Sequence, residues 1–572
     1  MRNTFLMRTT ALTICAVATG FSGYAQAQVP DAAVGSASAG RVEQQQILTP
    51  DNSANLSPRI EVKEIKIQDA PAGAEKVTFT LQNLQLDGVT TYSEADLRPV
   101  YADKIGQTIS LADLYGIAGD LTRKYRNDGY ILTQIVVPPQ TIEGGTARLQ
   151  VVEGYVSEVN VQGRDDGSLI RSYASKIKTN KGATNVKDLE RWMLLINDLP
   201  GVTARGVLSP SPTQTGAADM TVITERDNFD ALLGIDNYGS RYLGPTQVTA
   251  VASGNSLLGL NEKITAQAVA TPMDGLDPEL AYIGLNYLQP IFDYGTSFEI
   301  FGSKTLTSPG FDLKQFDVDG RSDLLGVTVR HPFIRSRALN LTGRATFDYR
   351  NVESDNDLEE TRKDRIRALR VGARAEAVDT LFGIGYNIAD IEVSHGVDVF
   401  GSSQENAPNL SRLEAEPDFY KVNAELQRLQ RIYGSVNVLL GVTGQLSNSP
   451  LYSSEEFGVG GISYGRGYDP SEIIGDDGVA GKVELQWTEP YKLPYLESYQ
   501  LFGFYDVGRV WNQDATTSEQ KIDSLASAGF GVRMDLPMEI DAGALLAFPL
   551  TRAPQTEDED KARLLFTLSK RF

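Results

Sequence analysis

Between residue 228 and the C-terminus, short segments of alternating apolar and polar residues follow one another, separated by turn residues. Residues 338–350 show the pattern most clearly, because every second side chain is apolar or glycine. These are Leu339, Leu341, Gly343, Ala345, Phe347 and Tyr349. The intervening positions are polar or charged, and residues 369–376 and 420–427 alternate in the same way. A half-buried soluble strand also alternates. Full charges on the polar face of segment after segment instead indicate a transmembrane β-barrel with a wet lumen.

The number of strands follows from the length of this region. Lipid cannot satisfy an open sheet edge, so the sheet must close. At roughly 20–22 residues per strand and connection, residues 228–572 predict about 16 antiparallel strands. The last strand is expected at residues 564–572, where Lys570 interrupts an otherwise apolar face. After the first 30 residues, no apolar run approaches the ~18–20 residues that a spanning helix needs.

Residues 77–155 have a different texture and predict an α+β module of order β-α-α-β-β. Ser93 and Ser110 each precede an aspartate by three residues, which marks the start of a helix. The expected elements are a strand at 77–81, helices after Ser93 and Ser110, and strands at 131–137 and 147–152. The second helix is expected to end near Gly129.

Residues 156–227 repeat this order and predict a second module. The expected elements are a strand at 156–161, helices at 169–177 and 186–199, and strands at 202–208 and 219–224. Residues 28–76 precede both modules and are rich in Ala, Ser, Asp, Pro and Gln, which favours a linker. A short helix is expected within it at residues 40–46.

The first 27 residues resemble a secretory signal peptide. Arg2 and Arg8 precede a short apolar stretch, and residues 25–27 read A-Q-A, a typical cleavage site. A lipoprotein signal is the alternative, because residues 12–15 read L-T-I-C. The bulky Ile14 before Cys15 argues against it. An exported chain with alternating charged strands is expected in an outer membrane.

Charge and cysteine content exclude several function classes. The formal net charge is -21, which argues against nucleic-acid binding. Cys15 is the only cysteine and is expected to leave with the signal peptide. The mature chain then has no disulfide, thiolate nucleophile or zinc–thiolate site. We expect no cofactor and no metal.

A family resemblance comes from three stretches of the first module. They are YRNDGYIL at residues 125–132, VPPQTI at 137–142 and VVEG at 151–154. They resemble the POTRA domain of two-partner (type V) secretion transporters, the outer-membrane pores for haemolysins and filamentous adhesins. The resemblance implies a signal peptide (1–27), a plug helix and linker (28–76), two POTRA domains (77–155 and 156–227) and a 16-stranded barrel (228–572).

A second, independent resemblance lies in the barrel region. Gly465, Arg466, Gly467 and Tyr468 resemble the (V)RGY/F signature of the family's sixth extracellular loop, which folds into the lumen. Phe504, Asp506 and Gly508 resemble its F-x-D-x-G barrel-wall motif. The resemblance implies that Arg466 pairs with Asp506. Physical chemistry agrees, since a partly desolvated arginine needs an anion and a bidentate pair would fix the loop.

Other patterns carry less weight. Residues 461–465 fit G-x-S-x-G, but the following R-G-Y-D-P starts no helix, and His331 and His395 are the only histidines. We therefore expect no enzyme. Acidic runs at 476–477 and 557–560 are expected to be solvated loops rather than cation sites. An aromatic girdle is as plausible as ordinary packing for four residues: Trp487, Tyr491, Tyr495 and Trp511.

The resemblance implies a function. The protein is expected in the outer membrane of a Gram-negative bacterium, as a monomer in contact with lipid, with its POTRA domains in the periplasm. These domains would bind an unfolded exoprotein as an added strand. The expected client-binding region comprises Tyr130, Leu132, Pro138, Pro139 and Gln140. The alternatives are a barrel insertase of the same superfamily and a porin. The sequence does not identify the client.

Overall fold

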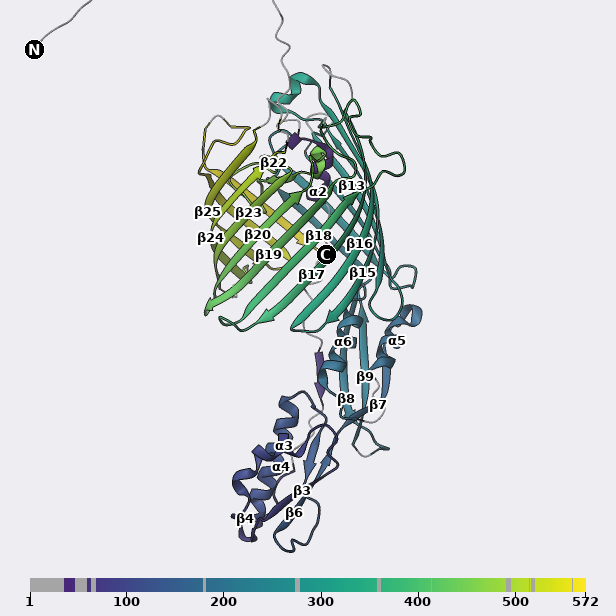
Figure 1. The fold of residues 1–572 in the computed structure, drawn as a ribbon, viewed down its shortest axis with the longest axis vertical. Coiled ribbons are helices and arrows are strands. Elements are labelled where there is room, and N and C mark those ends of the chain that lie inside the picture. The colour runs from purple at the N-terminus through teal and green to yellow at the C-terminus, as the bar shows by residue number, and fades with distance from the viewer. Residues whose placement is uncertain are drawn as a thin grey trace, which may run out of the picture.

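The computed structural model places a barrel above two α+β units arranged in a row (Figure 1). It describes residues 35–46, 59–62, 68–177, 182–214, 216–272, 278–356, 362–412, 414–489, 495–513, 515, 520–557 and 559–572. The expected signal peptide, with its alternative lipoprotein motif, lies outside these residues, as does Tyr491. None of the helices in the described ranges is long and apolar enough to cross a membrane.

Sixteen antiparallel strands form the closed barrel, which confirms the predicted architecture. In chain order they are β10 (Phe229–Asp236), β11 (Gln247–Asn255), β12 (Lys263–Ala270), β13 (Leu280–Pro290), β14 (Ser297–Thr307), β15 (Asp319–Arg335), β16 (Leu339–Asp355), β17 (Arg362–Asp379), β18 (Gly385–Gly396), β19 (Tyr420–Tyr433), β20 (Val436–Ser447), β23 (Asp477–Glu489), β24 (Ser498–Trp511), β25 (Ile522–Leu536), β26 (Ile540–Pro549) and β27 (Arg563–Arg571). The first and last strands close the sheet by pairing from Leu232 opposite Arg571 to Asp236 opposite Thr567.

The alternation along each strand separates the two faces of the wall as predicted. On β17, Leu369 and Val371 point outward and are 47% and 56% exposed in the isolated chain. Arg370 lies between them and points inward, where its Nε donates to Asp348 of β16 at 2.5 Å. Apolar side chains therefore face the lipid and paired charges face the lumen.

The first α+β unit contains more strands than the sequence predicts. Its elements are β2 (Thr78–Thr80), β3 (Asn83–Asp87), α3 (Glu94–Leu97), β4 (Thr108–Ser110), α4 (Leu111–Asn127), β5 (Gln134–Val136) and β6 (Thr146–Val152). The expected first strand corresponds to β2, which pairs only with β4, whereas the main sheet has the order β3-β6-β5. The sequence analysis missed β3 because its parallel partner, β6, lies far along the chain. The two helix starts are correct, and both carry the predicted capping boxes.

The second unit matches its predicted elements and gains one strand. Its elements are β7 (Tyr155–Gln162), α5 (Leu169–Lys176), α6 (Val186–Asn197), β8 (Val202–Pro210) and β9 (Ala217–Arg226). The sheet order is β1-β8-β9-β7, and β1 (Arg59–Val62) runs parallel to β8. The sequence pattern favoured a linker in residues 28–76 and did not reveal this strand. A segment of four residues becomes a strand here only because β8 supplies its hydrogen-bonding partners.

The two α+β units share a packed joint. Val186 N–H donates to the carbonyl of Gly129 at 2.9 Å, and the Asn185 side-chain amide donates to the Asp128 carbonyl at 3.1 Å. Asn185 also caps α6, because its Oδ1 accepts from Lys187 N–H at 3.0 Å. Leu132 of the first unit is buried in the hydrophobic core of the second.

The second unit is attached to the turns at one end of the barrel. The guanidinium of Arg335, at the end of β15, donates to both carboxylate oxygens of Asp198 at 2.8 and 2.7 Å. Lys176 of α5 pairs with Asp293 at 2.9 Å and lies 3.7 Å from the ring centroid of Tyr294, both in the turn after β13.

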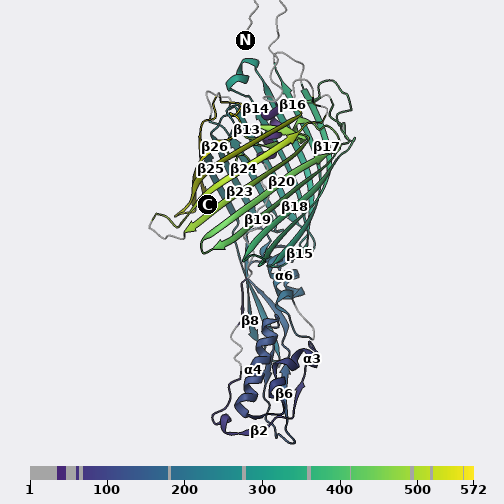
Figure 2. The same cartoon turned by 60° about the vertical axis from the view of Figure 1, so that its left-hand side comes forward.

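Two segments of the chain occupy the lumen. Helix α2 (Ala39–Gln46) was expected at residues 40–46 and lies inside the barrel, toward the end remote from the α+β units (Figures 1 and 2). It packs against β14, β15 and β16. The second segment is the connection between β20 and β23, residues 448–476, called here the lumenal loop. It contains the 3-10 turn η7 (Ser453–Glu455) and the strand pair β21 (Phe457–Val459) and β22 (Ile473–Gly475).

Candidate functional site in the barrel lumen

The tip of the lumenal loop carries the predicted RGY motif, and the chain turns sharply just before it. Gly465 has φ +112, which side-chain-bearing residues rarely adopt. A Cβ at this position would also lie 3.0 Å from the Cα of Gly460. The turn directs Arg466 toward β24, where the F-x-D-x-G motif lies on the wall.

Arg466 and Asp506 are brought together as the resemblance implies. Nε and Nη2 of Arg466 donate to the two carboxylate oxygens of Asp506 at 2.9 and 2.7 Å. The backbone N–H groups of Arg466 and Gly465 add bonds of 3.1 and 3.3 Å to the same carboxylate. Arg466 is 3% exposed and Asp506 is fully buried. This bidentate, desolvated contact fixes both the position and the orientation of the loop tip.

Glu484 is a third member of this cluster that the sequence analysis missed. It comes from β23, accepts from Nη1 of Arg466, and accepts from Nη1 of Arg533 on β25 at 2.7 Å. The Phe504 ring lies 3.6 Å from the Arg466 guanidinium carbon. Alternation along residues 483–486 places Glu484 on the lumenal face, but only the pairing of β23 with β24 brings it beside Asp506.

Close packing accounts for the remaining motif residues. A Cβ on Gly508 would lie 2.4 Å from Cγ1 of Val459 in β21, so the wall admits the loop only where a side chain is missing. Gly467 approaches β25 in the same way, at 2.8 Å from Cβ of Ser527. The hydroxyl of Tyr468 donates to the Ala526 carbonyl at 3.1 Å.

Buried charged side chains hold the base of the lumenal loop. Asp476 is fully buried and accepts from Arg412 Nη1 at 2.6 Å, Leu451 N–H at 2.7 Å and Gln513 N–H at 2.8 Å. The expectation that this acidic run is solvated is therefore wrong for Asp476. Loops from three parts of the chain donate to this carboxylate, and the local sequence around Asp476 does not indicate these distant contacts. In the second run, Glu559 and Asp560 are exposed as expected.

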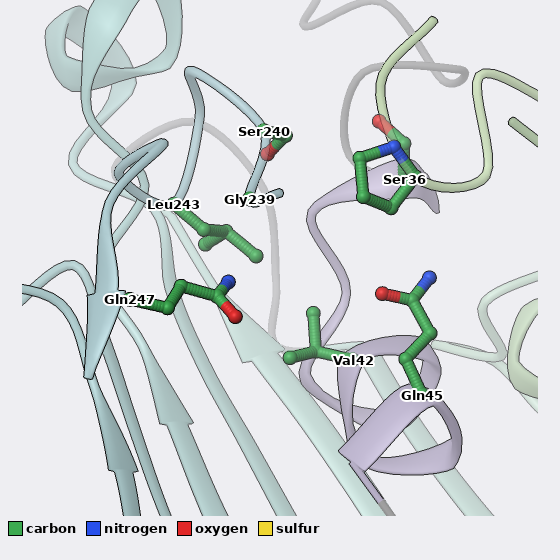
Figure 3. A pocket seen from close by; sticks show the side chains of 8 residues that line it. Ser36, Val42, Gln45, Gly239, Ser240, Leu243 and Gln247 are labelled. Atoms are coloured by element: carbon green, nitrogen blue, oxygen red, sulfur yellow. The ribbon is translucent and has the colours of Figure 1, made fainter. Parts of the chain in front are cut away.

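Helix α2 lies in the lumen beside the lumenal loop, where it packs against β14, β15, β16 and η7. Its residues Val42 and Gln45 face Leu243 and Gln247 across a small cavity that Pro470 also lines (Figure 3). The cavity volume is only about 10 Å³, which is roughly enough for one water molecule. Val42 packs against Leu243, Leu280 and Leu313. Apolar contacts thus hold the helix in its place inside the barrel.

The weaker sequence patterns have structural explanations. Residues 461–465 form part of the loop turn, and no helix follows them, so the nucleophile elbow is absent. His331 bonds to Thr296 at 2.9 Å, and His395 stacks on Tyr420 at 4.0 Å. Trp487 and Tyr495 are 42% and 84% exposed, while Trp511 is half-buried. Among the described residues, no group of three or more His, Cys, Asp or Glu side chains is arranged to hold a metal ion.

The five expected client-binding residues do not form one surface. Leu132 is buried in the joint, and Tyr130 packs at 5.9 Å edge-on to Tyr92. Gln140 is occupied by Arg148, whose backbone N–H and carbonyl it binds at 2.8 Å each. Pro139 is exposed and Pro138 is half-buried. A client role for this region stays a prediction.

A closed barrel with two α+β units at its mouth, and a lumen obstructed by its own chain, is the architecture of the POTRA-bearing outer-membrane barrels. The model of the family described as haemolysin secretion/activation protein ShlB/FhaC/HecB matches residues 219–534. That of the ShlB-type POTRA domain matches residues 79–154. The chain belongs to the ShlB/FhaC/HecB family.

Similarity to individual proteins agrees with this assignment. The heme/hemopexin transporter protein HuxB of Haemophilus influenzae (strain 86-028NP) is 24% identical over 83% of this chain and 84% of its own length. The outer membrane transporter CdiB of Escherichia coli is 22% identical over 90% of this chain and 87% of its own length. A solved structure of CdiB from Escherichia coli covers 95% of this chain and 99% of its own, with a TM-score of 0.70 and 20% identity.

The protein is therefore an outer-membrane transporter of two-partner secretion, with its barrel in the outer membrane and its POTRA domains in the periplasm. Its family comprises transporters rather than enzymes and secretes exoproteins. The barrel end that carries the second α+β unit is the periplasmic end.

Proposed function

We propose that this transporter binds one unfolded exoprotein through its POTRA domains and passes it through the barrel lumen, from which α2 must first withdraw. The observation that carries the proposal is the occupied lumen. Helix α2 is joined to the barrel only by non-covalent contacts, several of them polar, and is connected to the POTRA domains through residues 47–67. Such a segment blocks the pore at rest and can leave it without unfolding the wall.

Sheet edges of the POTRA domains are suited to an extended client. Strand β1 already lies parallel on the β8 edge of the second domain, which supports strand addition as the mode of binding. The outer edges of β3 in the first domain and β7 in the second are further candidates. Backbone hydrogen bonds at such an edge give affinity without strict demands on sequence.

The remaining assignments complete this proposal. Residues 1–27 are the signal peptide, 28–76 the plug helix and linker, 77–155 and 156–227 the POTRA domains, and 228–572 the barrel. The Arg466–Asp506 pair holds the lumenal loop in its resting position, with Gly465, Gly467, Tyr468, Phe504 and Gly508 shaping the contact. The transporter acts as a monomer surrounded by lipid. Folding of the client outside the cell gives the transport its direction.

A reversible tether tests whether α2 must leave. A Cβ at Gly40 of α2 would lie 3.0 Å from Cβ of Ser454 in the lumenal loop, so a G40C/S454C pair lies within reach of a disulfide. The mature chain offers no competing cysteine, since Cys15 lies in the signal segment. With a co-expressed exoprotein, we expect secretion to stop under oxidising conditions and to recover with a reductant, while each single-cysteine variant secretes normally.

Other outcomes would redirect the proposal. Full secretion with the disulfide closed would show that the client does not need the space of α2. A transporter that conducts small solutes but secretes no exoprotein would behave as a porin. Loss of other barrel proteins from the outer membrane on its deletion would indicate an insertase.

A further inference from the structure

Helix α2 has two charged residues, Arg41 and Glu43. Each forms an ion pair with a residue that also pairs with a second group outside α2. We propose that the site occupied by α2 stays charge-compensated after the helix leaves, because Arg350 and Glu456 each keep a second partner of opposite charge. Their second partners, Glu455 and Arg412, then act as positioning residues that set how readily the lumen opens. The inference rests on the proposed withdrawal of α2.

The first contact involves Glu43, which is fully buried. Its carboxylate accepts from the hydroxyls of Ser303 and Ser322 at 2.5 and 2.9 Å and lies 3.3 Å from Nε of Arg350. Arg350 also donates through Nη1 to Glu455 at 3.1 Å. Glu455 belongs to the lumenal loop, not to α2. Withdrawal of Glu43 therefore leaves Arg350 its shorter ion pair, to a carboxylate that Arg370 and Lys421 also contact at 2.9 and 2.7 Å.

The second contact involves Arg41, which is 3% exposed. Its Nη2 lies 3.8 Å from Oε2 of Glu456 and donates to the Glu456 carbonyl at 3.3 Å. The other oxygen of Glu456 lies 3.4 Å from Nη1 of Arg412, in the loop between β18 and β19. Two guanidinium groups thus share one carboxylate and repel each other. Here too the ion pair that stays is shorter than the one that α2 removes.

This arrangement lowers the electrostatic cost of emptying the site. A buried charge deprived of all partners is strongly unfavourable, whereas freed hydroxyl and carbonyl groups can bind water. The tip of the lumenal loop is the contrast. The hydrogen bonds to the Asp506 carboxylate among the described residues all come from Gly465 and Arg466. Moving that tip would leave Asp506 without them, so the structure favours release of α2 over release of the loop tip.

Removing Arg412 and removing Arg41 should shift the release of α2 in opposite directions. Replacing Arg412 by glutamine removes the second partner of Glu456, the repulsion on Arg41 and the ion pair with Asp476 at the loop base. Glu456 then depends on Arg41 alone among these two cations, so α2 should be held more tightly. Replacing Arg41 by glutamine removes the ion pair that α2 makes with Glu456, so α2 should leave more readily. Simple damage to the loop would loosen α2 in both variants. The opposite directions therefore separate a positioning role for Arg412 from a merely structural one.

The experiment uses the full-length purified transporter with Val42→Cys as reporter. Val42 is 4% exposed, so a charged maleimide reagent reaches the thiol only when α2 leaves. Relative to this parent, we expect R412Q to label about tenfold more slowly and R41Q about tenfold faster. R412K should restore the parent rate, because it returns a cation to Glu456. Opening events in a planar lipid bilayer should follow the same order.

Arg344→Gln is the matched control. Arg344 lies on the same strand as Arg350 and pairs in the lumen with Asp390 at 2.7 Å and Glu392 at 3.0 Å, away from α2. Its labelling rate should equal that of the parent. If R412Q is labelled at least as fast as the parent while R41Q is labelled faster, the role proposed for Arg412 is overturned. The proposed withdrawal of α2 is not affected by that result. Failure of every variant to label, while secretion continues, overturns the proposed withdrawal of α2 itself.

Discussion

Arg466 and Asp506 lie 40 positions apart in the chain, and Arg466 donates three of the four hydrogen bonds that the loop tip makes to this buried carboxylate, Gly465 the fourth. Two come from the guanidinium and two from the backbone of the loop tip. The backbone bonds depend on the loop conformation, and the side-chain bonds depend on the charge. The contact therefore fixes the loop by shape and by electrostatics together.

Replacing Arg466 by alanine should reduce exoprotein secretion at least about tenfold while the barrel still assembles, because buried Asp506 loses the guanidinium bound to it and Glu484 keeps only Arg533. Secretion into the medium and heat-modifiable migration of the folded barrel are the two measurements. Lysine at this position should rescue only partly, since it lacks the fork that binds both Asp506 oxygens. Wild-type secretion by the alanine variant would contradict the role of this pair.

Gly508→Ala should displace the lumenal loop from β24. The new methyl group would overlap Cγ1 of Val459, and we expect a loss of about 1–3 kcal/mol in stability of the assembled barrel. Gly503→Ala on the same strand is the control, because its nearest neighbour would be the Gly529 carbonyl oxygen at an ordinary 3.8 Å. The temperature of the heat-modifiability transition should fall for Gly508→Ala only.

Arg335→Gln should loosen the second POTRA domain from the barrel. Arg335 is 8% exposed and forks onto Asp198, so its loss leaves a carboxylate without its main partner, at a cost of about 3 kcal/mol. Arg337→Gln is matched to it, because the Arg337 side chain is 48% exposed and lies 3.5 Å from Glu190. Glu190 still accepts from the Arg337 backbone N–H at 2.6 Å in this variant, so losing the half-exposed side-chain pair should cost only about 0–1 kcal/mol. Spin-label distances between the domain and the barrel should broaden for Arg335→Gln and stay narrow for Arg337→Gln.

The stability of the first POTRA domain should depend on pH through Glu153. Partial burial disfavours ionisation of Glu153, but hydrogen bonds from Thr90, Thr91 and Tyr125 outweigh it and hold its pKa below the ordinary 4.5. A lowered folded-state pKa adds stability above pH 4.5, which is lost as pH falls through the folded-state pKa. Hydrogen exchange of α4 in the full transporter, corrected for intrinsic rates, should show wild type more protected than Glu153→Gln at pH 7. The difference in protection between wild type and variant should shrink below pH 4.5. A difference that does not change with pH would contradict the role of Glu153.

Local patterns in the sequence predicted much of the fold. Alternation at residues 338–350 and 369–376 predicted wall strands, because a strand between lipid and water must present opposite chemistry on its two faces. Caps at Ser93 and Ser110 marked the starts of α3 and α4, since capping is a contact between residues three positions apart. The motifs at 465–468 and 504–508 indicated the Arg466–Asp506 contact only through family resemblance.

Tertiary structure decided what depends on partners distant in the chain. Strand β1 exists because β8 lies beside it, and β3 joins the main sheet because β6 does. Glu484 becomes the second carboxylate for Arg466 through the pairing of β23 with β24, and Asp476 is buried because three loops close over it. A sequence records which residues can be apolar, charged or turning. The closure of the barrel and the inward folding of α2 and the lumenal loop decide which charges lose water and must find one another.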